Sequence, residues 1–245
     1  MTALALSSVG VEFDGHRALS GVTLTIDEGE KVAVVGPSGA GKSTLLAVCS
    51  GALAPTTGTA YILNRPASDV DRDRSLRRKI GVVHQDLGLV GSLKVVHNAN
   101  AGRLGYWSTT RALMSLVHPQ ELSAALTVLD RLGVGDKAFV RTDTLSGGER
   151  QRVALARILL QEPSVVLADE PVASLDPARA VDVLTILTRI AAEGCRALVV
   201  SLHDVRLARR FCDRVIGIRC GVVIFDLPAA EMSVDVERDL YEFAS

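Results

Sequence analysis

A glycine-rich stretch at residues 36–44 matches the pattern G-x-x-x-x-G-K-[ST] in full. Glycines let the backbone curl so that successive N–H groups face a phosphate, and a helix beginning near Lys42 adds the partial positive charge of its N-terminus. In this pattern the lysine reaches the β- and γ-phosphates, and the hydroxyl of Ser43 can coordinate Mg²⁺. The alternative is a plain turn between a strand and a helix. We expect nucleotide phosphates to be bound by Gly36, Pro37, Ser38, Gly39, Ala40, Gly41, Lys42, Ser43 and Thr44.

Two adjacent carboxylates, Asp169 and Glu170, follow an apolar run at residues 165–168. Carboxylates at the end of such a run are costly to desolvate unless a cation or a ligand uses them. We expect Asp169 to hold Mg²⁺ and Glu170 to polarise an attacking water as general base. The pair alone is moderately specific, but together with the glycine-rich stretch it indicates a phosphohydrolase.

A second glycine-containing loop, Ser146, Gly147 and Gly148, precedes an expected helix from Arg150 to Gln161. A glycine loop at the N-terminus of a helix is a further anion site. One nucleotide does not need two such cradles from one chain.

Short apolar runs separated by helical stretches predict a parallel sheet that is buried on both faces. Ligands bind such sheets beyond the carboxyl ends of the strands. Polar groups that converge on this edge are hard to explain by core packing. The four runs lie at residues 31–35, 80–83, 165–168 and 197–200. In the same order, they are followed by the glycine-rich stretch, by Gln85, by Asp169 with Glu170, and by His203.

The remaining segments frame this predicted core. Apolar residues alternate over residues 9–13 and 22–26, which predicts half-buried antiparallel strands. Residues 95–161 have a mostly helical pattern, residues 215–224 indicate a hairpin, and residues 234–243 predict a short amphipathic helix. No linker, repeat or low-complexity tract interrupts the chain, so we expect one domain.

Composition limits the class of protein. The chain has 245 residues, 48% of them hydrophobic, which is enough to bury a core of α/β size. With 27 basic and 28 acidic residues the formal charge is −1, so we expect no nucleic-acid partner. The basic cluster between Arg72 and Lys79 is interpreted as a solvated helix face.

Cysteines and hydropathy indicate where the protein resides. The four cysteines lack metal-site spacing and are interpreted as small apolar residues in a reducing compartment. No apolar run reaches the roughly 18 residues that a membrane span needs, and the first residues do not resemble a signal peptide. We expect a soluble cytoplasmic protein that reaches a membrane only by docking to another chain.

Taken together, the motifs resemble those of the ABC ATPases: residues 36–44, then residues 146–148, then Asp169 and Glu170. The resemblance covers nearly the whole chain. It implies an α/β fold, namely a P-loop ABC nucleotide-binding domain with a RecA-like parallel-sheet core, an N-terminal antiparallel β subdomain and a helical subdomain. It places the core with the β subdomain at about 1–92 and 162–245, and the helical subdomain at about 93–161, within one domain of 1–245.

The resemblance assigns roles to further residues. Gln85 matches the glutamine that senses Mg²⁺ and water beside the membrane partner, and Asp176 ends a loop, from Ser174, that crosses between subunits. His203 matches the histidine that contacts the γ-phosphate, and Phe13 lies where an aromatic ring stacks on adenine. Each assignment has a plain alternative. Gln85 would be an ordinary surface glutamine, and the loop ending at Asp176 a simple turn before Pro177. His203 would be a core histidine, and Phe13 a core aromatic residue.

The same resemblance implies a homodimer in which two copies bind ATP·Mg²⁺ head to tail. The sequence departs from the family pattern at Glu149, where glutamine is more usual, at Phe13, where tyrosine is common, and at Cys220 in the hairpin turn. None of these changes removes a phosphate-contacting residue. Each site is expected to take Lys42, Ser43, Gln85, Asp169, Glu170 and His203 from one chain and Ser146, Gly147 and Gly148 from the other.

Two segments, residues 101–113 and 168–177, resemble the ATPases of phosphonate importers. This resemblance implies a bacterial importer of phosphonates or phosphite, in which the ATPase is held at the cytoplasmic face of the membrane by permease subunits. A substrate-binding protein would deliver the cargo. Another cargo, such as an amino acid, a metal chelate or a lipoprotein, remains an alternative. A non-transport ABC ATPase is a further alternative, but the chain has neither a heptad run nor a second glycine-rich phosphate loop.

Overall fold

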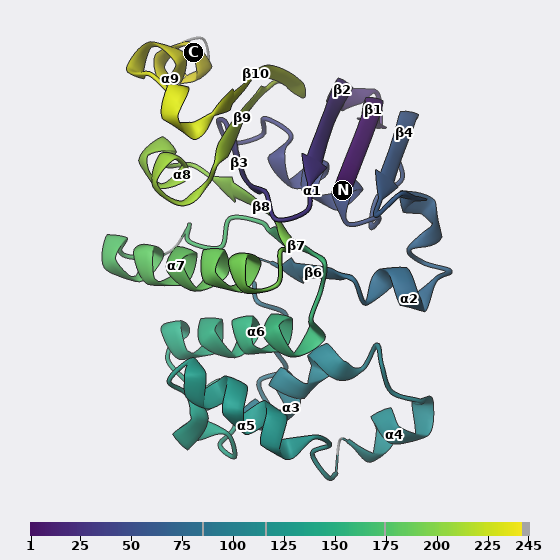
Figure 1. Ribbon diagram of the computed structural model, residues 1–245, viewed down its shortest axis with the longest axis vertical. Coiled ribbons are helices and arrows are strands. Elements are labelled where there is room, and N and C mark those ends of the chain that lie inside the picture. Colours follow the sequence, from purple (N-terminus) through teal and green to yellow (C-terminus); the bar gives the residue numbers. More distant parts are fainter. Residues whose placement is uncertain (85, 116, 174, 242–245) are drawn as a thin grey trace.

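The computed structural model describes residues 1–84, 86–115, 117–173 and 175–241. A four-stranded sheet and a six-stranded sheet lie beside each other, and a group of helices lies below the larger sheet in Figure 1. The predicted α/β fold with a parallel-sheet core is confirmed. The predicted subdomain boundaries remain a prediction.

The larger sheet has the strand order β10-β9-β3-β8-β7-β6. All neighbouring strands in it are parallel except β9 and β10, which form the predicted hairpin. The apolar runs predicted as parallel strands therefore do form one sheet. The strands are β3 (Lys31–Val35), β6 (Ile80–Val83), β7 (Val165–Ala168), β8 (Ala197–Leu202), β9 (Arg214–Arg219) and β10 (Val222–Pro228).

The smaller sheet is antiparallel, with the order β2-β1-β4-β5. A tight turn joins β1 to β2 at Asp14 and Gly15, whose φ angles of 48° and 81° are the left-handed values of a two-residue hairpin loop. The predicted alternating strands are confirmed. The strands are β1 (Thr2–Phe13), β2 (His16–Asp27), β4 (Thr57–Ile62) and β5 (Arg65–Pro66).

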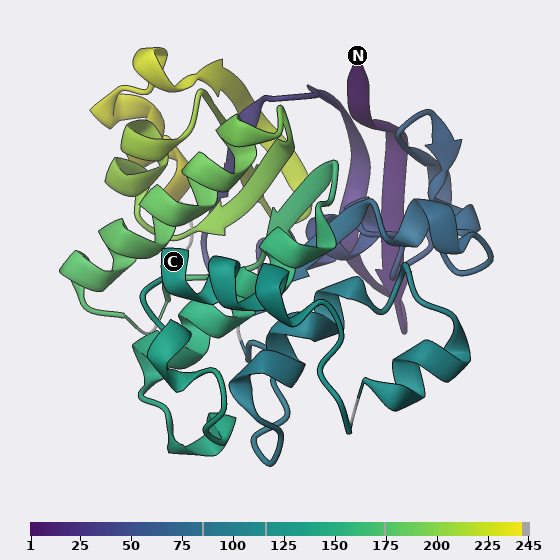
Figure 2. The ribbon, with the colours of Figure 1, turned by 60° about the horizontal axis from the view of Figure 1, so that its bottom comes forward.

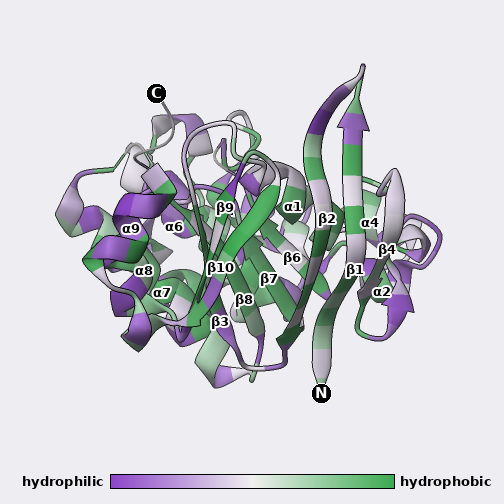
Figure 3. Cartoon of the chain, turned by 90° about the horizontal axis from the view of Figure 1, so that it is seen from above, coloured by the Kyte–Doolittle hydropathy of each residue, from purple (hydrophilic) through white to green (hydrophobic). Residues whose placement is uncertain are grey.

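The strands of the larger sheet other than the edge strand β10 are mostly buried on both faces, and Figure 3 shows them as hydrophobic strands with more hydrophilic helices outside. Successive side chains of a strand point to opposite faces. Accordingly Val32 and Val34 join the core that packs on the smaller sheet, whereas Ala33 and Val35 join the core beneath the helices. This double burial explains why the strands are continuous apolar runs.

Helices cover the second face of the larger sheet. In Figures 1 and 2, α6 lies between α7 on one side and α3 with α5 on the other, and it contacts all three. No helix of the described residues is long and apolar enough to cross a membrane. The helices are α1 (Lys42–Cys49), α2 (Arg74–Arg77), α3 (Val95–Asn100), α4 (Thr109–Met114), α5 (Leu122–Arg131), α6 (Gly147–Gln161), α7 (Pro177–Glu193), α8 (Val205–Phe211) and α9 (Val234–Tyr241).

Two local expectations differ from the structure. The helix predicted from Arg150 begins at Gly147, because Ser146 caps its N-terminus. The basic cluster is not only a solvated face. Its helix, α2, has a single turn, and Arg74 donates hydrogen bonds to the carbonyls of Leu104, at 2.6 Å, and Trp107.

Candidate active site

The glycine-rich stretch links β3 to α1 in the way the pattern predicts. Gly41 caps α1 with a left-handed φ of 106°, and Gly36 has a φ of 156°. A Cβ at Gly36 would lie 2.1 Å from the carbonyl oxygen of Ile218, and one at Gly41 would lie 2.6 Å from that of Ala18. Both positions therefore require glycine, because the hairpin and β2 approach the loop closely.

Lys42 is the first residue of α1, and only 4% of its surface is exposed. Its Nζ donates to the carbonyls of Gly36, at 2.8 Å, and Pro37, at 3.1 Å. Burial lowers the pKa of Lys42, while Glu170, 3.9 Å away, and Asp169 act in the opposite direction. A buried ammonium whose positive charge is only partly balanced by carboxylates attracts an anion. Lys42 is therefore suited to bind a phosphate.

Asp169 lies directly after β7 and meets α1 and β8. Its Oδ1 accepts hydrogen bonds from the hydroxyls of Ser43, at 3.1 Å, and Ser201, at 2.8 Å. A carboxylate and a hydroxyl at this separation are oxygen donors of the type Mg²⁺ takes when phosphate oxygens and water complete its octahedron. The described residues hold no cluster of three or more His, Cys, Asp or Glu suited to a metal.

Glu170 and His203 face each other across the ends of β7 and β8. The imidazole Nε2 of His203 lies 2.7 Å from Oε1 of Glu170. Glu170 has a φ of 46°, a left-handed value that costs a residue with a Cβ about 1–3 kcal/mol. Such strain is typical of functional sites. In this conformation the carboxylate of Glu170 lies close to both His203 and Lys42.

The loop 146–148 forms the N-terminus of α6. Ser146 and Glu149 make a reciprocal capping box: the amide and the hydroxyl of Ser146 each donate to Glu149, both at 2.8 Å, and the amide of Glu149 donates back to the hydroxyl. Glu149 also forms an ion pair with Lys137. A Cβ built on Gly147 or Gly148 would meet no atom within 4 Å, so the loop presents open backbone.

The structure joins some predicted residues and separates others. Hydrogen bonds and ion pairs connect Lys42, Ser43, Asp169, Glu170 and His203 into one network. Within the described part of the chain, the hydrogen bonds of the Ser146 side chain go to Glu149 and not to this network. Gly147 and Gly148 line a hollow of about 420 Å³ together with Glu170.

The other predicted residues have mixed outcomes. Phe13 lies at the end of β1 with 47% of its surface exposed, so it is not a core aromatic residue. Asp176 caps α7 by accepting from the amide of Arg179 at 3.0 Å, which is the use expected of a turn before Pro177. Gln85 and Ser174 lie outside the described residues.

Two residues of the site were missed in the sequence. Ser201 is fully buried in β8, and it accepts a hydrogen bond from the amide of Glu170 at 2.7 Å while it donates to Asp169. A serine in an otherwise apolar run was the available signal. Arg157 on α6 donates to the carbonyls of Leu87, at 2.7 Å, and Gly88, at 2.8 Å, and burial lowers its pKa. It fastens α6 to the loop that follows β6.

Comparison with known sequences gives consistent findings. Residues 19–173 match the family model described as ABC transporter. The chain is 48% identical, over 98% of its length, to the phosphonates import ATP-binding protein PhnC of Anaeromyxobacter dehalogenans, and it spans 48% of that protein. It is 43% identical, over 99% of its length, to the protein of the same name from Thiobacillus denitrificans, and spans 93% of it.

Solved structures with this fold include the ATP-binding cassette MJ0796, in a dimeric post-hydrolysis state bound to ADP and Pi. That structure has a TM-score of 0.79 and 31% identity, and the match covers 92% of this chain and 98% of MJ0796. The cbiO1 protein of Clostridium perfringens, part of the ABC transporter complex cbiONQ, has a TM-score of 0.78 and 29% identity, with 98% and 95% covered.

Proposed function

The chain belongs to the ABC transporter family, and from that premise we propose that it is the ATP-hydrolysing subunit of a bacterial importer of phosphonates, or of a relative such as phosphite. The observation that carries the cargo assignment is the identity of 43–48% to proteins named as phosphonate import ATP-binding proteins, over nearly the whole chain. The Thiobacillus protein, of which the chain spans 93%, supports it most directly.

Each residue of the network has a role in this proposal. Lys42 offers its ammonium to the β- and γ-phosphates, and the amides of residues 36–44 enclose them. Glu170 takes the proton of the attacking water, and His203, held on Glu170, contacts the γ-phosphate. Ser43 and Asp169 would hold Mg²⁺, which neutralises charge on the phosphates when bound. Phe13, exposed at the end of β1, is proposed to stack on the adenine.

We further propose that two copies share each nucleotide. Ser146, Gly147 and Gly148 present open amides at a helix N-terminus, and their own chain's phosphate loop does not use them. The dimer of MJ0796, bound to ADP and Pi, supports such a pairing. ATP favours the closed pair because its γ-phosphate contacts both chains, and hydrolysis removes that differential affinity.

The proposed membrane partner is a pair of permease subunits, which would hold the ATPase at the cytoplasmic face, and a substrate-binding protein would deliver cargo. A hollow of about 420 Å³ between α2 and the segment 101–105 supports a docking site, because four arginines and a single acidic residue line it. We name it the arginine hollow. Its residues are Asp71, Arg72, Arg74, Arg77, Arg78, Ala101, Gly102, Leu104, Gly105 and Gln161.

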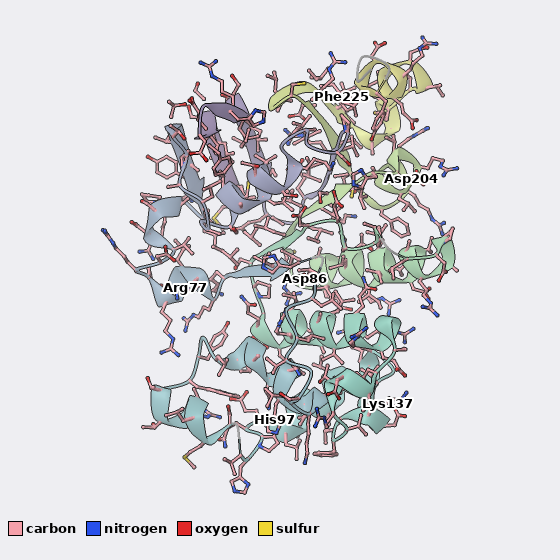
Figure 4. The ribbon with its side chains drawn as sticks, turned by 180° about the vertical axis from the view of Figure 1, so that it is seen from behind. Arg77, Asp86, His97, Lys137, Asp204 and Phe225 are labelled. Carbon is pink, nitrogen blue, oxygen red and sulfur yellow. The ribbon has the colours of Figure 1, made fainter. Side chains whose placement is uncertain are left out.

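One arginine of the arginine hollow, Arg78, packs on the nearby ring of Tyr106. The guanidinium of Arg78 lies 4.8 Å from the centre of the Tyr106 ring, and that of Arg103 lies 5.4 Å from it. Arg77, labelled in Figure 4, lies on α2, and its guanidinium donates to the carbonyls of Val70, at 3.2 Å, and Asp71, at 2.5 Å. A permease segment with carboxylates would complement this surface.

The experiment for the cargo is the ATPase activity of the complex reconstituted with its permease and binding protein. The panel contains phosphonates, phosphite, phosphate and amino acids. Stimulation by phosphonates or phosphite is the expected result. Stimulation only by another class would overturn the cargo assignment and leave the ATPase assignment standing.

A further inference from the structure

The C-terminal helix α9 reaches the nucleotide site through Tyr241. The phenol hydroxyl donates a hydrogen bond to the carbonyl oxygen of His203 at 3.1 Å. Val35 and Leu202 are paired in the parallel register of β3 and β8, so the residues that follow them, Gly36 and His203, begin two adjacent loops. One side chain from the far end of the chain therefore lies at the place where the phosphate loop and the histidine loop leave the sheet.

Helix α9 is anchored firmly enough to hold this side chain in place. Leu240, the residue before Tyr241, is fully buried in the core beneath the larger sheet. The carbonyl of Asp239 accepts a hydrogen bond from the guanidinium of Arg219 at 2.6 Å, which ties the helix to the end of β9. Figure 1 shows α9 beside α8, the helix that starts just after His203.

The phenol of Tyr241 is kept in its neutral form. Burial is the main cause that raises its pKa, Glu237 adds to the rise, and a backbone hydrogen bond from Gly36 lowers it by less. Only a neutral phenol can donate to a carbonyl, so the environment favours the observed bond. The phenol of Tyr241 therefore also interacts with the backbone of Gly36, the first residue of the phosphate loop.

We propose that Tyr241 is a positioning residue for ATP hydrolysis, which holds the backbone of His203 so that its imidazole stays on Glu170. The imidazole lies 2.7 Å from Oε1 of Glu170, and this hydrogen bond leaves the ordinary range when the two groups separate by more than about half an ångström. The inference rests on the proposed function. It adds α9 to the elements that set the turnover rate, as a positioning element that touches no substrate.

The test is Tyr241→Phe, which keeps the ring packed and removes only the hydroxyl. A lost hydrogen bond of ordinary strength predicts a fall in kcat of about two- to tenfold, with the affinity for ATP nearly unchanged. The matched control is Tyr61→Phe on β4, whose ring is 42% exposed. ATP affinity is measured by nucleotide binding, and turnover by phosphate release.

A second readout does not depend on turnover. The chain has five histidines, so the imidazole resonances of His203 can be assigned by comparison with His203→Gln in ¹⁵N-histidine-labelled protein. Tyr241→Phe should shift or broaden them, and Tyr61→Phe should not. Equal kcat and unchanged resonances in Tyr241→Phe would overturn the inference, and so would an equal loss of turnover and ATP affinity. A wild-type protein without ATPase activity would overturn the proposed function, while the resonances would still decide the role of Tyr241.

Discussion

At the scale of single residues, the site is a chain of oxygen and nitrogen atoms held by the ends of neighbouring strands. Ser201 links the two candidate catalytic carboxylates, since it donates to the side chain of Asp169 and accepts from the backbone of Glu170. Asp169 in turn reaches Ser43 on α1. The position of each reactive group is thus fixed by a partner on a different element.

Replacement of Glu170 by glutamine tests the role of the carboxylate. The amide keeps the shape of the side chain but cannot accept the proton of the attacking water. We expect ATP binding to be retained and turnover to fall by about 10²–10⁴-fold. Phosphate release and nucleotide binding measure the two quantities, with Glu231→Gln on the surface as control. Turnover at the wild-type level would refute the assigned role.

Ser201→Ala tests the buried bridge. The substitution leaves the amide of Glu170 without its partner and leaves Oδ1 of Asp169 with Ser43 alone. A buried donor without a partner costs about 1–3 kcal/mol of the free energy of unfolding. Urea denaturation measures the loss, and Ser123→Ala on the exposed side of α5 is the matched control. We also expect slower turnover, because Glu170 would lose the bond that holds its strained backbone. Equal stability of the two variants would contradict the bridge.

At the scale of elements, α6 connects the glycine loop 146–148 with the loop that follows β6. Its N-terminus carries the loop 146–148, and Arg157 in its middle holds the carbonyls of Leu87 and Gly88. Leu87 and Gly88 come shortly after Gln85 in the sequence. A shift of α6 would therefore displace the loop that contains Leu87 and Gly88, which is expected to face the permease. This connection supports the proposal that nucleotide binding is mechanically linked to the membrane partner.

The capping box of α6 should be sensitive to acid. The ion pair with Lys137 and the hydrogen bonds from Ser146 lower the pKa of Glu149 to about 2, from an ordinary value of 4.5. Because the folded-state pKa is depressed, the stabilising contribution of Glu149 is complete above about pH 4.5 and is lost as the pH falls toward 2. The wild type should therefore be more stable than Glu149→Ala at pH 7, and this difference should shrink across that window.

Glu149→Gln is the informative companion variant. Glutamine retains an oxygen that accepts from the amide of Ser146, and it gives up the ion pair with Lys137. We expect ATPase activity to persist and the acid dependence from this position to vanish. Denaturation curves between pH 7 and about pH 2 measure both variants. An unchanged acid dependence in Glu149→Gln would show that the depressed pKa of Glu149 does not contribute to stability.

At the scale of the whole molecule, the sequence was informative wherever a local pattern has one structural solution. The apolar runs became the strands of a sheet buried on both faces, and the polar residues after them converged at one edge. The left-handed turns at Gly41 and Gly36 were likewise implied by the phosphate pattern. These features follow from local chain chemistry.

Other features depend on contacts between distant segments and left little trace in the sequence. Ser201 lies directly after the predicted apolar run 197–200 and was given no role, and the contact of Tyr241 with His203 joins residues 38 positions apart. The start of α6 was predicted at Arg150 instead of Gly147, because residues 146–148 were interpreted only as a glycine loop and Ser146 was not recognised as the N-cap. The basic cluster was interpreted as solvated, although Arg74 and Arg78 pack on the segment 104–107.

The measurement that tests the account most directly is the molecular mass of Glu170→Gln by light scattering, with and without ATP·Mg²⁺. Slow hydrolysis in this variant preserves the shared nucleotide, so we predict a monomer without ATP and a dimer with it. Ser146→Arg, combined with Glu170→Gln, should bind ATP and remain monomeric. A Glu170→Gln protein that binds ATP and stays monomeric at high concentration would contradict the claim that two copies share the nucleotide.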